Sequence, residues 1–178
     1  MSFDGDKVTR EFLLDRLLAD VGLPALVGVN PLTDLTHVYE ANQVPDDPEA
    51  GVGAVDATTG LRRPYIVFYN QSGGSVPLDA IVEPGAGGAE GLDATVWYEA
   101  DWSVLAIGPA HDKPRLQLAK MRIYAAVCNV AGIATASGFI NQSLVVRSVD
   151  IDAGDVNGDP YHQMGWTVHI YAGPPLEA

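Results

Sequence analysis

The acidic stretch 150–159 contains the side chains whose types and spacing come closest to a binding site. Asp155, Asn157 and Asp159 place oxygen atoms at alternate positions, which suits Ca²⁺ because it takes six to eight oxygen ligands. Counting from Asp155, the sixth position is Pro160, where a calcium loop needs glycine, and the twelfth is Trp166, where it needs a carboxylate. We therefore interpret the stretch as an acidic turn between strands. Asp155, Asn157 and Asp159 remain the only metal-ligand candidates, and we expect no metal or other cofactor.

The four histidines lack the spacing of a helical zinc site, in which two histidines lie four residues apart. His162 and His169 lie seven apart in one predicted strand, so they should point to opposite faces. His37 and His111 are isolated in the sequence, and a site would have to gather ligands from distant segments. The single cysteine, Cys128, excludes an internal disulfide and is interpreted as a small core residue.

Hydrolytic chemistry finds little support in the residue patterns. Ser72 and Ser137 do not lie in the Gly-x-Ser-x-Gly turn of a nucleophile elbow. Glu99 and Asp101 share one face of a predicted strand and could act as an acid–base pair. We favour a solvated outer face or an interface there. The glycine-rich stretch 84–91 lacks the lysine and hydroxyl of a phosphate loop. We expect no catalytic residues.

Composition narrows the classes of partner. The chain has 178 residues, 18.8 kDa, a formal charge of −13 and a pI near 4.4. That charge argues against gripping nucleic acid or an anionic membrane. No apolar run reaches the roughly 18 residues that span a bilayer. The first residues, MSFDGD, lack the features of a secretory signal, so we expect an acidic protein made inside the cell.

Periodicity predicts two main helices and several strands. A spacing of three and four predicts helices over 6–21 and 113–131, the second opened by Asp112 and Pro114 and ended by Gly132. Alternation of apolar and polar residues predicts strands. The predicted strands are 64–69, a weaker 76–82, 94–107, 142–151 and 161–172.

The order of these elements predicts the fold class. Helix, several strands, helix and a closing strand pair give an α+β fold, with a mainly antiparallel sheet and the two helices packed on one face. We expect a single domain, 1–178, with long flexible loops at about 42–63 and 84–91. The closing pair is expected to be joined by a loop longer than a two-residue turn.

In this order, the chain resembles the tail terminator (tail completion) proteins of long-tailed bacteriophages. The likeness rests on the opening helix 6–21, the strand RPYIVFY at 63–69, the long strand 94–107 and the helix 113–131. It continues through LVVRSVD at 144–150, the acidic loop and GWTVHIY at 165–171. It covers roughly residues 6–172 and contains no catalytic signature.

The resemblance implies structural work. Proteins of that family form a hexameric ring that caps the tail tube and offers a docking face to the head connector, and they are not enzymes. It implies a homo-oligomer in the virion, at the head-proximal end of the tail, assembled in the host cytoplasm. Its partners would be the tail tube protein and the head–tail connector protein. An acidic lumen would let DNA pass without specific binding.

Three alternatives stay open. One is another ring of the head–tail junction, such as a head-completion or stopper protein. The second is a calcium-binding interaction module that uses the 150–159 loop. The third is a small hydrolase, which would need a pocket bringing a histidine against a serine or a carboxylate.

Overall fold

A computed structural model describes residues 3–29, 34–44, 64–76, 97–156 and 159–175, with the side chains of 74–76, 155, 156 and 159 left out. The helical elements are α1 (Gly5–Leu18), α2 (Leu23–Val27), the 3₁₀ turns η1 (Ala41–Gln43) and η4 (Ala110–Asp112), and α3 (Lys113–Val127). The strands are β1 (Val38–Glu40), β2 (Tyr65–Val76), β3 (Trp97–Pro109), β4 (Ala131–Ala134), β5 (Phe139–Val156) and β6 (Asp159–Gly173).

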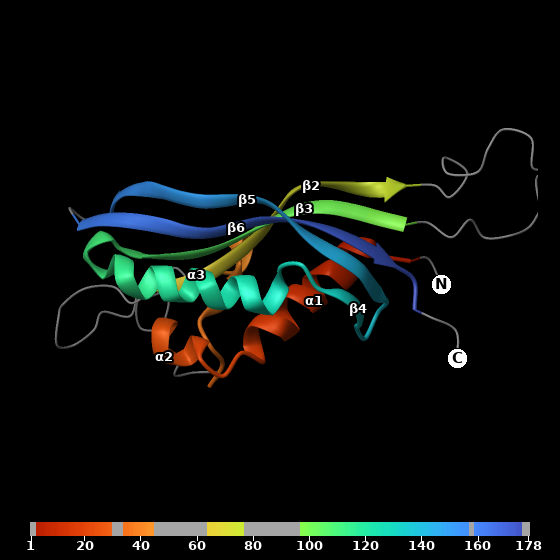
Figure 1. Ribbon diagram of the computed structural model, residues 1–178, viewed down its shortest axis with the longest axis horizontal. Coiled ribbons are helices and arrows are strands. Elements are labelled where there is room, and N and C mark those ends of the chain that lie inside the picture. The colour runs from red at the N-terminus through yellow and green to blue at the C-terminus, as the bar shows by residue number, and fades with distance from the viewer. Residues whose placement is uncertain (1–2, 30–33, 45–63, 77–96, 157–158, 176–178) are drawn as a thin grey trace, which may run out of the picture.

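The strands form one six-stranded sheet in the order β1-β2-β3-β6-β5-β4. β1 runs parallel to β2, and every other pair is antiparallel. The helices α1, α2 and α3 lie together on one side of the sheet (Figure 1). The predicted α+β class, with a mainly antiparallel sheet and helices on one face, is confirmed. None of the described helices is long and apolar enough to cross a membrane.

The first helix is shorter than the predicted 6–21, because a second helix, α2, starts shortly after it. The Asp4 side chain caps α1 by accepting from the Lys7 N–H at 3.1 Å. After α1 ends at Leu18, the Asp20 carboxylate accepts from the Gly22 and Leu23 N–H groups at 2.9 and 3.1 Å. These bonds open α2, in which proline occupies the first turn, a position it tolerates, so helical structure resumes at Leu23.

The helix α3 also ends early. Cys128 is already extended, and Asn129 has a φ of 54°, the left-handed region that asparagine tolerates better than most residues. Ala131, predicted as the last helical residue before Gly132, instead begins the edge strand β4. At the start of α3, Asp112 makes no capping hydrogen bond and pairs with Arg115 at 3.1 Å.

The long strands extend beyond their predicted bounds. β2 continues from the predicted 64–69 through residue 76, and β3 covers 97–109, while 77–96 lie outside the described residues. The predicted loop 84–91 and most of the loop 42–63 therefore remain predictions.

The closing strand pair has a much tighter turn than predicted. Val156 pairs with Asp159, so only residues 157–158 separate β5 from β6, and these two lie outside the described residues. The long-loop expectation was wrong because Asn-Gly is itself a strong signal for a two-residue hairpin turn. β5 carries register shifts at three places: Ile140/Gln142, Val145/Arg147 and Asp152/Gly154.

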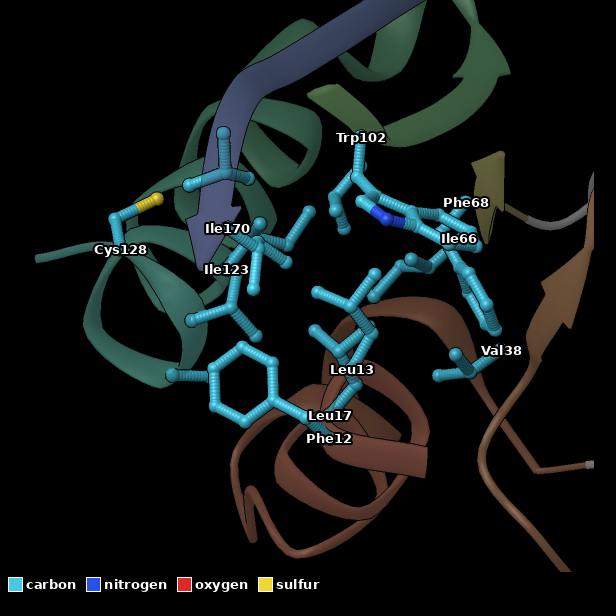
Figure 2. Close-up of a cluster of buried hydrophobic side chains, with 14 of the residues drawn as sticks. Phe12, Leu13, Leu17, Val38, Ile66, Phe68, Trp102, Ile123, Cys128 and Ile170 are labelled. Carbon is cyan, nitrogen blue, oxygen red and sulfur yellow. The ribbon is translucent and has the colours of Figure 1, made fainter. Parts of the chain in front are cut away.

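The core lies between the helices and one face of the sheet. Phe12, Leu13 and Leu17 of α1 project towards Trp102 of β3 and Ile170 of β6 (Figure 2), and all of them are at most 1% exposed. The alternating burial along β3 places its even-numbered residues in this core, as the sequence pattern predicted. The opposite face of the sheet is free of described helices.

Candidate interaction surface

The face of the sheet opposite the helices, here called the open face, collects polar side chains of β3 and β6. Ser103 lies directly across from Thr167, Asp101 from His169, and Glu99 from Tyr171. Glu99 and Asp101 therefore share one face, as predicted. Their carboxylates are 46% and 33% exposed, which agrees with a solvated face.

One polar row crosses four strands of this face. Gln71 of β2 donates to the Ser103 hydroxyl at 2.6 Å, and the Ser103 and Thr167 hydroxyls lie 3.5 Å apart. Arg147 of β5 then donates from Nε to the Thr167 hydroxyl at 3.1 Å. Ser103 and Thr167 are buried even though the described helices lie on the other side. The row therefore ties the strands together on a face that no described helix covers.

A second row surrounds His169. Its Nδ1 lies 2.7 Å from an Asp101 oxygen and its Nε2 3.7 Å from a Glu99 oxygen, while the Ser72 hydroxyl donates to Asp101 at 3.4 Å. The Tyr171 ring meets the imidazole edge-on, with ring centres 4.6 Å apart. In a nucleophilic triad the hydroxyl bonds to the imidazole, whereas here it bonds to the carboxylate. The arrangement suits a binding face better than a hydrolytic site.

β5 adds exposed apolar side chains at the edge of the sheet: Leu144 is 36% exposed, Val146 54% and Ile151 53%. Such side chains beside hydrogen-bonding groups are the combination that protein interfaces use.

His162 forms a second cluster, on the helix-covered face near the β5–β6 turn. Its Nδ1 lies 2.8 Å from an Asp152 oxygen and its Nε2 2.5 Å from an Asp150 oxygen. The hydrogen bond from His162 lowers the pKa of Asp150, and the positive charges of Lys120 and Lys113 add to this. The carboxylates sit on opposite nitrogens of one ring, so the three groups cannot converge on a single ion. The described residues contain no group of three or more His, Cys, Asp or Glu that could hold a metal.

Lys120 is buried, which the sequence pattern did not indicate. Its ammonium donates to the Ser148 hydroxyl at 2.6 Å and to the Val149 carbonyl at 3.3 Å, and it lies 5.0 Å from the centre of the Trp166 ring. These contacts fasten α3 to β5.

The helix layer has a shallow groove between α2 and α3, with a volume of about 430 Å³. An ion pair lies at the groove, with Arg122 Nε 2.6 Å from an Asp20 oxygen. The lining residues are Asp20, Gly22, Leu26, Leu118, Met121, Arg122 and Ala125. Leu118 and Met121 are 53% and 61% exposed, so the groove presents apolar surface to solvent.

The candidate metal ligands are Asp155, Asn157 and Asp159. Asn157 lies outside the described residues, as do the side chains of Asp155 and Asp159. The prediction for this stretch therefore stays a prediction.

The other singled-out residues have structural contacts. Cys128 is buried, as predicted for a core residue, and burial raises the pKa of its thiol to about 12. Ser137 donates to Glu11 at 2.7 Å, which ties the β4–β5 connection to α1. His37 is buried with its Nδ1 2.8 Å from the Tyr39 hydroxyl, and His111 is exposed in η4.

Sequence reasoning missed the carboxylates that surround His162. The Asn-Gly dipeptide at 157–158 favours a two-residue turn. Such a turn would have placed His162 opposite a residue next to Asp152, so the dipeptide could have indicated that the two lie close together. The long-loop interpretation concealed that register.

Comparisons with known proteins show a likeness of structure and none of sequence family. No family model and no curated protein sequence matches the chain. Among solved structures, the fold is similar to a chain in a structure described as the virion of a native gene transfer agent (GTA) particle. The two chains are 17% identical with a TM-score of 0.61, and the match covers 97% of this chain and 99% of the other. At this identity the likeness concerns the fold.

Proposed function

We propose that this protein is a structural component of a phage-like particle, and specifically a tail terminator. In this role, copies form a ring that caps the tail tube and joins it to the head connector. The observation that carries the proposal is the likeness to a chain of a gene transfer agent virion, which runs over 97% of this chain and 99% of that one. The resemblance in element order to tail terminators supports the finer assignment.

The two layers of the fold suit self-association. A ring needs two different surfaces on each copy, because its contacts are head-to-tail. The open face with its polar rows and the groove beside α3 lie on opposite layers, and both present side chains that a neighbour could cover. A hexamer is the copy number that the family resemblance implies.

The negative charge of the chain is consistent with a ring through which DNA passes without binding to the protein. The chain carries −13 overall, so a lumen lined by it repels phosphate. The helix α3 is the exception, since it contains Lys113, Arg115, Lys120 and Arg122 and no acidic residue. Lys120 and Arg122 bind groups of the same chain.

The proposed role involves no catalysis. In His162 and in His169, each ring nitrogen lies near a carboxylate oxygen. Neither imidazole therefore has a nitrogen free to act as a general base. A head-completion or stopper ring is the second candidate, because the similar chain is described by its particle and not by a position within it.

The experiment is to image purified protein, alone and mixed with purified tail tubes, by mass photometry and negative-stain microscopy. We expect rings with six-fold symmetry or decoration at tube ends. Val146→Asp on β5 and Met121→Asp at the groove test which surface the contact needs. Asp15→Asn, at an exposed position of α1, is the control. Protein that stays monomeric and leaves tube ends bare contradicts the proposal.

A deletion in the producing strain separates the two candidates. Loss of a terminator should give overlong tails, because it stops tube growth. Normal-length tails that fail to join heads would favour head completion. Calorimetry with Ca²⁺ on the wild type and Asp155→Ala tests the calcium-module alternative, which requires saturable binding that the variant loses.

A further inference from the structure

His162 occupies an unusual position for a titratable group, because its side chain is only 4% exposed and both ring nitrogens face carboxylates. A neutral imidazole has one N–H donor, and its other nitrogen carries a lone pair. A carboxylate only accepts. Both contacts, at 2.5 and 2.8 Å, are therefore hydrogen bonds only when the ring carries two protons.

The surroundings contain few other groups that could take over this role. β5 contributes Asp150 and Asp152, and α3 contributes Lys113 and Lys120, whose charges act on Asp150. The Lys120 ammonium is bonded to Ser148 and the Val149 carbonyl. β3 presents Gly108 opposite His162, and glycine has no ionisable side chain.

Two further ionisable groups lie in η4, which packs against β6: His111 and Asp112. His111 is exposed, and Asp112 is paired with Arg115 at 3.1 Å. Among the described residues named here, the imidazole is therefore the group in hydrogen-bond contact with the two carboxylates of β5.

The backbone at this point is irregular. The β5–β6 register shifts between Asp152 and Gly154, next to the residue that pairs with His162. A bulge interrupts the ladder of hydrogen bonds, so side chains contribute more to closing the hairpin there.

We propose that His162 is a proton-dependent clamp on the outer end of the β5–β6 hairpin. With two protons, the ring ties Asp150 and Asp152 to β6 across the bulge. When one proton leaves to solvent, one carboxylate faces a lone pair, and that end of the hairpin opens more often. Histidine is the side chain whose charge ordinarily changes between about pH 5 and 8, and this general range sets the pH values of the test. The device is independent of the proposed place in a particle.

The test is amide hydrogen exchange of the full-length protein at pH 5.5 and 8.5, expressed as protection factors so that base catalysis is removed. We expect protection of peptides from 149–154 and 160–165 to fall at least tenfold at the higher pH, with α1 unchanged. His162→Gln should abolish this dependence, and His169→Gln, on the opposite face of β6, should retain it.

Asp152→Asn keeps the test decisive if His162→Gln folds poorly. An amide can donate to an unprotonated nitrogen, so this variant should be better protected than the wild type at pH 8.5, a gain that unfolding cannot produce. The proposal is overturned if wild-type protection is the same at both pH values, if His162→Gln shows the same fall, or if Asp152→Asn shows no gain.

Discussion

The two faces of β6 carry the same residue type in contrasting settings. His162 lies under the helix layer, 4% exposed, with carboxylates at 2.5 and 2.8 Å. His169 lies on the open face, 26% exposed, with carboxylates at 2.7 and 3.7 Å. A buried polar group must find protein partners, whereas an exposed one can use water. The face of the strand, more than the residue, therefore decides whether the contacts stabilise the fold.

The largest expected difference between the two faces is in the free energy of unfolding that is lost when an apolar side chain is truncated. Ile170→Ala removes a fully buried side chain and should lower the free energy of unfolding by about 3 kcal/mol. Leu144→Ala, at an exposed position on β5, should cost less than about 1 kcal/mol. Urea unfolding followed by tryptophan fluorescence measures both. Equal costs would mean that the open face is as much a core as the covered one.

The second contrast is between the histidines themselves. His162→Gln should cost on the order of 2 kcal/mol, because it removes two hydrogen bonds from a buried ring. The measurement is again urea unfolding. An unchanged urea midpoint would show that the contacts of Asp150 and Asp152 with His162 contribute little to the stability of the protein.

His169→Gln should cost less than about 1 kcal/mol under the same conditions, since exposed ion pairs contribute little. Its effect should also shrink in 0.5–1 M salt, because salt screens exposed charges. A cost as large as that of His162→Gln would remove the distinction between the faces.

Acid should lower the stability of the folded protein in part by protonating Asp150. Its folded pKa is lowered, chiefly by the hydrogen bond from His162, so its contribution is present above the unfolded value near 3.8 and is lost as pH falls through the folded value. Asp150→Asn should therefore narrow the difference in urea midpoint between pH 6 and pH 3. Asp15→Asn on α1 is the control and should leave that difference as in the wild type.

The smallest effect is expected at Cys128, behind the covered face. Burial holds the pKa of its thiol at about 12, so at pH 8 it is protonated as well as inaccessible. A disulfide reagent should label no thiol in the native protein and one in urea. Rapid native labelling would show that the end of α3 opens readily.

The sequence pattern predicted the fold class because amphipathic periodicity is a local signal. It located α1, α3 and the long strands, and the alternation along β3 and β6 assigned their faces correctly. β1 and β4 were missed because three- and four-residue edge strands hardly express a period.

The polar clusters needed pairing that no local pattern contains. Asp101 meets His169 only because β3 lies beside β6, although 68 residues separate them in the chain. The His162 cluster depended on a bulge as well as on the turn, since the Asn-Gly turn alone would pair His162 with Ala153 and not with Asp152. The helix bounds depended on side-chain contacts such as that of Asp20 with the Leu23 amide.

The three register shifts of β5 have a consequence for handling the protein at high concentration. Beyond Gln142 this strand has no neighbouring strand on its outer side within the described residues. A straight exposed edge of that length would template fibrils by recruiting extended segments from other molecules. The register shifts space the backbone amide groups of β5 unevenly, which hinders the pairing of another strand along this edge. Straightening β5 by deleting a bulge residue should therefore convert a well-behaved solution into one that gels or precipitates.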